Sequence, residues 1–172
     1  MLNAMALENP GVYTLIIYAP KLVKIRVGKL GLVDFPAGYY AYTGSALGRG
    51  ALSLRGRVER HFRAGKKLHW HIDFLLNSRT TKIVSAVVSE TKLPKECQVS
   101  SFLEKTRGAT VIIKGFGSQD CKLGCGAHLH HFPTQSSSEV IKLVLTTHRK
   151  VGLSPVTLSQ PYTRTPKNLP RA

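Results

Sequence analysis

The stretch AYTGSALGRGALSLRGRVERHF, residues 41–62, contains the features that decide the fold. It begins as a strand-like run, breaks at a glycine-rich turn and continues as a basic helix. On a helical wheel, the apolar side chains of this helix fall within one stripe, which predicts the face that packs on a core. The stripe consists of Ala51, Leu54, Val58 and Phe62.

The face beside this stripe carries a cluster of nitrogen donors, since Arg57, Arg60 and His61 are spaced at i, i+3 and i+4. Two interpretations stay open, a solvated basic face or a phosphate-binding face. The glycine-rich turn before the helix favours the second interpretation. The turn has neither a Walker nor a Rossmann fingerprint, so it does not predict a nucleotide site.

Outward from this unit, the pattern predicts an α+β fold with a small, mainly antiparallel central sheet flanked by about three helices. The early strands imply an antiparallel meander with an extra hairpin between the first and last of them. The expected strands are 11–19, 22–27, 32–35, 38–44, 81–89 and 110–117, and the further helices are 69–78 and one that starts from Pro94.

Two parts of the chain differ in composition. Residues 8–132 are expected to form one domain. Residues 133–172 contain five prolines and a single acidic residue, Glu139, so we expect a basic, partly disordered tail. Within it, residues 139–150 fit either one helix or one strand.

The net charge is the strongest compositional signal. The 25 Lys and Arg residues exceed the 9 Asp and Glu residues, giving a formal charge of +16. This charge favours a nucleic-acid partner, although solubility or anionic lipid are alternatives. No membrane-spanning stretch or signal peptide is visible, and three cysteines do not indicate a disulfide framework. We therefore expect an intracellular protein, cytoplasmic or nucleoid-associated, without a membrane partner.

Several motifs together resemble the GIY-YIG nuclease superfamily, and most closely an uncharacterised branch of it found in archaea and bacteria. The resemblance covers residues 8–132. It departs from the wider superfamily in the extra hairpin between the two tyrosine motifs. The motifs are GVY (11–13), GYYAYTGSA (38–46), R-x-x-R-H-F (57–62), HWHID (69–73), Glu96-Cys97 and SQDCKLGCGAHL (118–129).

The resemblance implies a metal-dependent DNA endonuclease. Tyr13 and Tyr42 would hold a water molecule or a phosphate oxygen, and Arg57 would stabilise the phosphorane. Glu96 would bind one Mg²⁺ or Mn²⁺ ion. The alternatives are ordinary strand aromatics for the tyrosines and favourable interaction with a helix dipole for Glu96. For His61, proton transfer and simple packing are equally compatible with the pattern.

A second set of residues is predicted to contact nucleic acid along the turn and the basic helix. Gly44 lets a backbone approach Tyr42, and the arginines suit phosphate. For His69, Asp73 is expected to orient the ring or to pair with it. The set comprises Gly44, Ser45, Arg49, Arg55, Arg60 and His69.

Cys121, Cys125 and His128 form a possible zinc motif, with Cys97, His130 and His131 as further candidate ligands. The spacing is not that of a standard zinc knuckle, so a thiol-lined core is favoured over structural zinc.

Three functions follow from the sequence. The first is a DNA endonuclease that acts in repair or on structured DNA, since no sequence-reading module is apparent. The second is a nucleic-acid-binding module without catalysis. The third is an adaptor that binds proteins through the tail segment QPYTRTPKNLP, residues 160–170.

Overall fold

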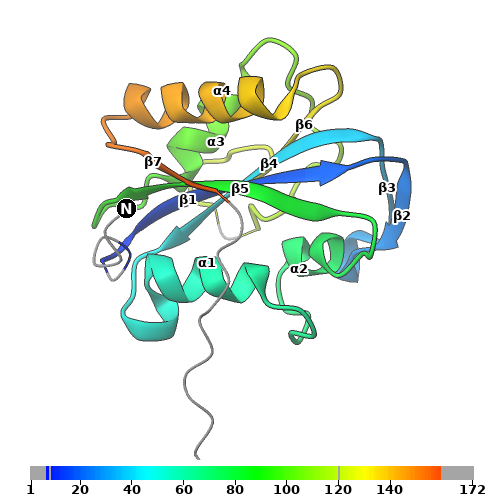
Figure 1. Ribbon diagram of the computed structural model, residues 1–172, viewed down its shortest axis with the longest axis horizontal. Helices are drawn as coiled ribbons and strands as arrows, with labels where there is room; N and C mark the ends of the chain where they lie inside the picture. Colours follow the sequence, from blue (N-terminus) through cyan, green and yellow to red (C-terminus); the bar gives the residue numbers. More distant parts are fainter. Residues whose placement is uncertain (1–6, 8, 120, 160–172) are drawn as a thin grey trace, which may run out of the picture.

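The computed structural model describes residues 7, 9–119 and 121–159, and its middle layer is a five-stranded antiparallel sheet (Figure 1). The strand order is β6-β4-β1-β5-β7, so the first strand is central, and β2 and β3 form a separate two-stranded sheet. The strands are β1 (Gly11–Ala19), β2 (Val23–Arg26), β3 (Leu32–Phe35), β4 (Gly38–Ala46), β5 (Lys82–Glu90), β6 (Leu129–Phe132) and β7 (Val156–Ser159).

Helices cover both faces of the sheet, with α1 and α2 on one face and α3 and α4 on the other (Figure 1). Short 3-10 turns at Gly28–Leu30 and Gly50–Leu52 complete the described helical segments. The α-helices are α1 (Leu54–Phe62), α2 (His71–Leu76), α3 (Glu96–Glu104) and α4 (Ser137–Lys150). None of the helices in the described ranges is long and apolar enough to cross a membrane.

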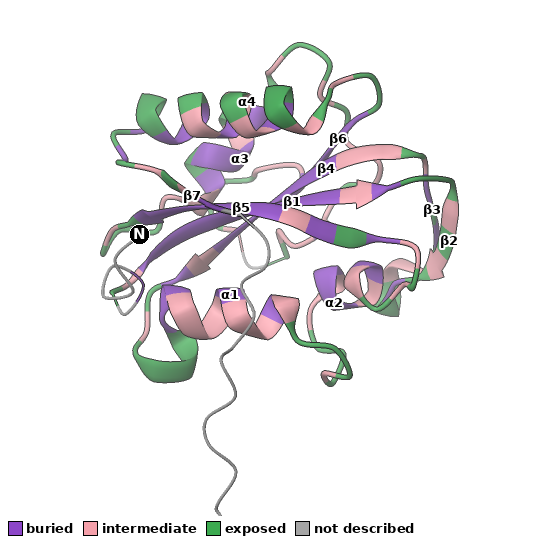
Figure 2. Cartoon of the chain, viewed as in Figure 1, coloured by how far each residue is buried: buried purple, intermediate pink, exposed green. Residues whose placement is uncertain are grey.

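The central strand β1 explains why the sheet needs two helical layers. Tyr13 and Leu15 contribute to the core under α1 and α2, whereas Val12 and Ile16 contribute to the core under α3 and α4. Both faces of β1 are therefore buried (Figure 2). This accounts for the almost continuous apolar run GVYTLIIYA, in place of an alternating pattern.

The pairing of β1 with β4 brings the two predicted tyrosines together. In this register Tyr13 lies opposite Gly44, and Leu15 lies opposite Tyr42, so both tyrosines occupy one face as diagonal neighbours. The extra hairpin is confirmed as β2 and β3. The meander is wrong, because β1 pairs with β4 and β5 while the hairpin stands apart.

The predicted strand 110–117 is also wrong. Thr110 forms one isolated bridge with His131, and turns follow it. Ile112 and Ile113 pack against the core under α1 and α2, but they have no partner strand. Gly115 and Gly117 take positive φ angles that are not those of a strand. The β-branched residues of this segment pack against the core. Strand propensity alone does not distinguish such packing from membership of a strand.

The sheet and core continue past the predicted boundary at residue 132. Helix α4 begins at a capping box in which Ser136 and Glu139 each bond the other's backbone N–H, and its Val140 and Val144 enter the second core. Strand β7 then pairs with β5. The fold therefore extends to Ser159, and the tail segment 160–170 lies outside the described residues.

Candidate active site

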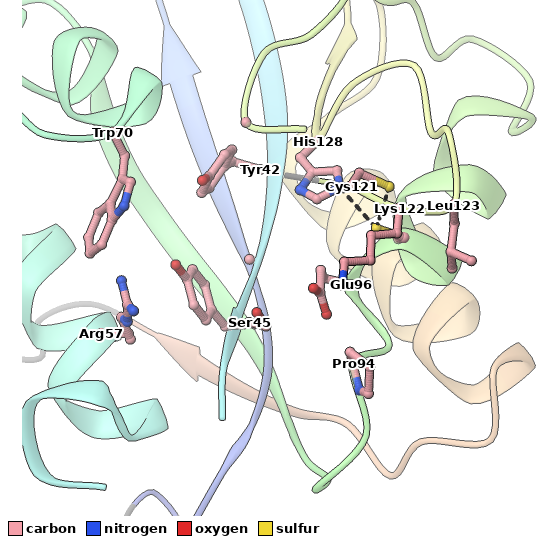
Figure 3. A pocket seen from close by; sticks show the side chains of 14 residues that line it. Tyr42, Ser45, Arg57, Trp70, Pro94, Glu96, Cys121, Lys122, Leu123 and His128 are labelled. Carbon is pink, nitrogen blue, oxygen red and sulfur yellow. Dashed lines mark hydrogen bonds between the residues drawn. The ribbon is translucent and has the colours of Figure 1, made fainter. Parts of the chain in front are cut away.

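A cavity of about 650 Å³ opens where strand β4 loses its neighbour (Figure 3). The pairing of β4 with β6 ends at Tyr42, and the Thr43 N–H donates one further hydrogen bond to the His128 carbonyl, so the described residues of β6 leave the end of β4 unpaired on this side from Gly44 on. The cavity reaches around this edge and collects side chains from both faces. Its lining is Tyr13, Tyr42, Gly44, Ser45, Arg57, Trp70, Pro94, Glu96, Cys97, Gly117, Cys121, Lys122, Leu123 and His128.

Four of the five predicted catalytic residues line this one cavity. Tyr13 and Tyr42 come from β1 and β4, and Arg57 comes from α1 on the same face of the sheet. Glu96 is the first residue of α3, on the opposite face. Side chains separated by more than eighty residues in the sequence therefore share one space, as the resemblance implies.

His61, the fifth predicted residue, is buried behind Tyr13 and does not line the cavity. Its Nε2 and the Tyr13 hydroxyl are 2.8 Å apart and share a hydrogen bond. Burial lowers the pKa of His61 to about 3, so its ring is neutral at pH 7. Burial also raises the pKa values of Tyr13 and Tyr42, with the Tyr42 charge adding to the effect at Tyr13. The cavity therefore holds two neutral phenols.

Gly44 leaves room for the ring of Tyr13. A Cβ at position 44 would lie 2.5 Å from the Tyr13 hydroxyl oxygen and 2.6 Å from Cζ. The glycine is therefore part of what fixes Tyr13 at the cavity wall.

Replacing Gly44 by Ala is expected to displace Tyr13 and to destabilise the fold by about 1–3 kcal/mol, since the extra methyl group overpacks this contact. Denaturant unfolding measures the loss. The matched test is a double-mutant cycle with Tyr13→Leu, in which removal of the ring should reduce the cost of the alanine. An equal cost in both backgrounds would contradict the assignment of Gly44.

Glu96 and Arg57, which both line the cavity, each carry a buried polar atom without a protein partner among the described residues. Glu96 Oε2 and Arg57 Nε are buried, and neither has a hydrogen-bond partner among the described residues. Glu96 is also the one acidic side chain in the described lining. Since buried polar atoms are normally paired, both groups are suited to a ligand.

Trp70 is a cavity residue that the sequence does not identify. The predicted helix 69–78 includes Trp70, but α2 starts only at His71 and Trp70 precedes it as the N-cap residue. The guanidinium carbon of Arg57 lies 4.3 Å from the centroid of a Trp70 ring, and that of Arg60 lies 4.2 Å away. Only the fold brings this tryptophan beside the two arginines, so the sequence alone gives no signal for the cation–π contacts.

Arg60 serves the fold, which corrects its assignment to a substrate backbone. Its two terminal nitrogens donate to both oxygens of buried Asp73 at 2.8 and 2.9 Å, and one of them also donates to the Lys67 carbonyl. Asp73 accepts from the backbone N–H groups of His69 and Trp70, so it does not pair with the His69 ring. Although burial opposes it, these hydrogen bonds lower the pKa of Asp73 to about 2.

Asp73→Asn is expected to destabilise the protein by about 2–3 kcal/mol, because Arg60 loses its charged partner while part of its side chain remains solvated. Chemical denaturation at pH 7 measures the change. Asp34→Asn is the matched control, since the Lys24–Asp34 pair is exposed and should contribute under about 1 kcal/mol. Equal losses for the two variants would contradict this role for Asp73.

The remaining predicted nucleic-acid contacts divide between the cavity and the surface. Gly44 and Ser45 line the cavity. Arg49 and His69 are exposed, and Arg55 is half-buried; none of these three reaches the cavity lining. Lys122, by contrast, lines the cavity from the loop before β6 and was not predicted. The only feature of the sequence that points to Lys122 is its position next to Cys121.

A Cys₃His cluster forms the wall beside Glu96, and it can bind a metal such as zinc. Cys97 joins Cys121, Cys125 and His128, and the four donor atoms all lie within 4.8 Å of one another. Burial lowers the pKa of His128 to about 4, which leaves a neutral imidazole. His130 and His131 are not members: His130 is buried apart, and His131 bonds the Ala37 carbonyl at 2.9 Å.

Comparison with known proteins places the whole site within one family. No curated protein and no solved structure matches the chain. A family model described as Domain of unknown function DUF123 matches residues 12–152, from β1 to the end of α4. The matched range includes every cavity residue and the complete Cys₃His cluster. The chain therefore belongs to the DUF123 family.

Proposed function

We propose that this protein is a metal-dependent endonuclease that hydrolyses phosphodiester bonds of DNA. The observation that carries the proposal is the convergence of Tyr13, Tyr42, Arg57 and Glu96 on one cavity. The resemblance to GIY-YIG nucleases assigns chemistry to these same four residues. The charge of +16 supports a polyanionic substrate.

The donor set at Glu96 fits Mg²⁺ or Mn²⁺. Such ions take oxygen ligands and often bind through one carboxylate, several waters and substrate phosphate oxygens. Glu96 supplies a carboxylate whose Oε2 has no partner among the described residues. A bound divalent ion would supply charge neutralisation and a lowered water pKa.

The other three side chains would act on the substrate directly. The planar guanidinium of Arg57 suits the phosphate oxygens, and its contact with Trp70 holds it in place. Tyr13 and Tyr42 would orient the attacking water by hydrogen bonds. Burial raises the pKa values of both phenols and so favours their neutral form, which supports a role in positioning the water. His61 would fix the Tyr13 hydroxyl from behind.

The second candidate is a nucleic-acid-binding module without catalysis. The same net charge favours it, and so do the two neutral phenols, which can donate hydrogen bonds but are poor bases. It predicts salt-dependent binding with no cleavage under any metal. The two functions therefore differ in one measurable respect, the product formed in the presence of a divalent ion.

The test is incubation of the full chain with supercoiled plasmid, branched DNA and damaged duplex DNA, in Mg²⁺, in Mn²⁺ or in EDTA. Endonuclease activity predicts nicked or linear product in Mg²⁺ or Mn²⁺ and none in EDTA. Binding without product under every condition would assign the protein to the second candidate. An Arg57→Ala variant run in parallel excludes a contaminating nuclease, whose activity would not change.

A further inference from the structure

The Cys₃His cluster joins two parts of the chain that are distant in the sequence. Cys97 lies in the first turn of α3, whereas Cys121, Cys125 and His128 belong to the segment between Gly117 and β6. Cys121 Sγ lies 2.7 Å from both Cys97 Sγ and Cys125 Sγ, and Cys125 Sγ lies 3.0 Å from His128 Nε2. The donors thus face one common point.

We propose that these four residues bind one Zn²⁺ ion in a closed, structural site. Three thiolates and one imidazole form a standard tetrahedral zinc donor set, with no position left for a substrate. Mg²⁺ and Mn²⁺ prefer oxygen ligands, so this site and the Glu96 carboxylate select different ions.

The loop needs such an anchor because it has little regular structure of its own. Its described residues between Gly117 and His128 form no helix or strand. The backbone hydrogen bonds that support it include those from Gly115 to Gly126 and from Cys121 to Ser118. His128 is better fixed, since its backbone bonds Phe116 and Thr43. Zinc would tie the free part of the loop to α3.

This anchor has a consequence for the cavity (Figure 3). Cys97 directly follows Glu96, and Cys121 directly precedes Lys122 and Leu123, all of which line the cavity. One ion would thus fix the α3 wall against the loop wall and determine where the Glu96 carboxylate lies.

Metal analysis of the full chain tests the site directly. Protein purified without added chelator should contain about one zinc per chain. Replacement by Co²⁺ should give the thiolate charge-transfer and intense d–d bands of a tetrahedral site. Cys125→Ser should lose most of the zinc, whereas Gln119→Ala, an exposed non-ligand in the same loop, should retain it. Absence of stoichiometric zinc, or iron in its place, would overturn the proposal.

A second measurement covers the case in which Cys125→Ser does not fold. In the wild-type protein the three thiols should react slowly with an alkylating reagent. They should become reactive when a strong chelator removes zinc, with metal release matching thiol exposure. Fast alkylation of all three thiols before chelation would contradict zinc binding. These readouts use no nucleic acid, so their outcome is separate from that of the proposed nuclease activity.

Discussion

Glu96→Gln is expected to reduce DNA cleavage by at least about 10³-fold while DNA binding is retained, equivalent to about 4 kcal/mol of transition-state stabilisation. The amide has nearly the same size as the carboxylate but no charge to hold a divalent cation. Initial rates of plasmid nicking in Mg²⁺ and in Mn²⁺ measure the change. A filter-binding or anisotropy assay in EDTA measures DNA affinity separately.

The matched control for this variant is Glu104→Gln. Glu104 is the last residue of the same helix, is exposed and does not line the cavity. It should leave cleavage within about twofold of wild type, because small surface substitutions rarely exceed 0.5 kcal/mol. If Glu96→Gln cleaves as fast as Glu104→Gln, the carboxylate does not hold the metal and its place in the first turn of α3 is explained by the helix dipole.

The strands of the sheet could be predicted from the sequence wherever a β-branched or aromatic run also has a partner strand in the fold. The strand 11–19 is confirmed at both ends, since its β-branched run is bounded by Pro10 and Pro20. Residues 110–117 carry the same pattern but lack a partner strand, and only the tertiary structure shows this. The side-chain pattern of residues 139–150 fits a helix and a strand equally. The capping box at Ser136 and Glu139 now explains the helix.

The candidate site was predictable where motifs specify single residues, and not where partners decide a residue's role. Tyr13, Tyr42, Arg57 and Glu96 line the cavity as expected. Arg60 carries the same charge one helical turn from Arg57, yet its guanidinium group is already paired with the Asp73 carboxylate. Helical spacing cannot separate these two arginines, because the difference arises from Asp73 of α2, which only the folded chain brings to Arg60.

Two buried histidines, His61 and His148, are together expected to lower the free energy of unfolding by about 5 kcal/mol between pH 7 and pH 4.5. His128 and His130 add to this fall, since burial also lowers their pKa values to about 4. Burial lowers the pKa of His61 to about 3 and that of His148 to about 4, from an ordinary value of 6.5. Below pH 6.5 the unfolded chain binds a proton at each residue and the folded protein does not, so acid favours unfolding. Each histidine then contributes a slope of about 1.4 kcal/mol per pH unit.

His148 allows this slope to be assigned to a single group. Its Nε2 bonds Thr14 Oγ1 at 2.9 Å and its Nδ1 bonds Ser89 Oγ at 2.8 Å, so the neutral ring is fully paired between α4 and the sheet. His148→Gln keeps one donor and one acceptor but does not titrate. Urea unfolding at half-unit steps from pH 6.5 to 4.5 should show its slope reduced by about 1.4 kcal/mol per pH unit.

The control for the His148 variant is His69→Gln, which makes the same exchange at an exposed histidine. Asp73, with a folded pKa of about 2 and an unfolded value near 4, affects stability only below about pH 5 and does so equally in both variants. If His148→Gln and His69→Gln show the same slope, His148 is protonated in the folded protein. Its hydrogen bonds to Thr14 and Ser89 would then both be donated by the ring, and the acid sensitivity would arise elsewhere.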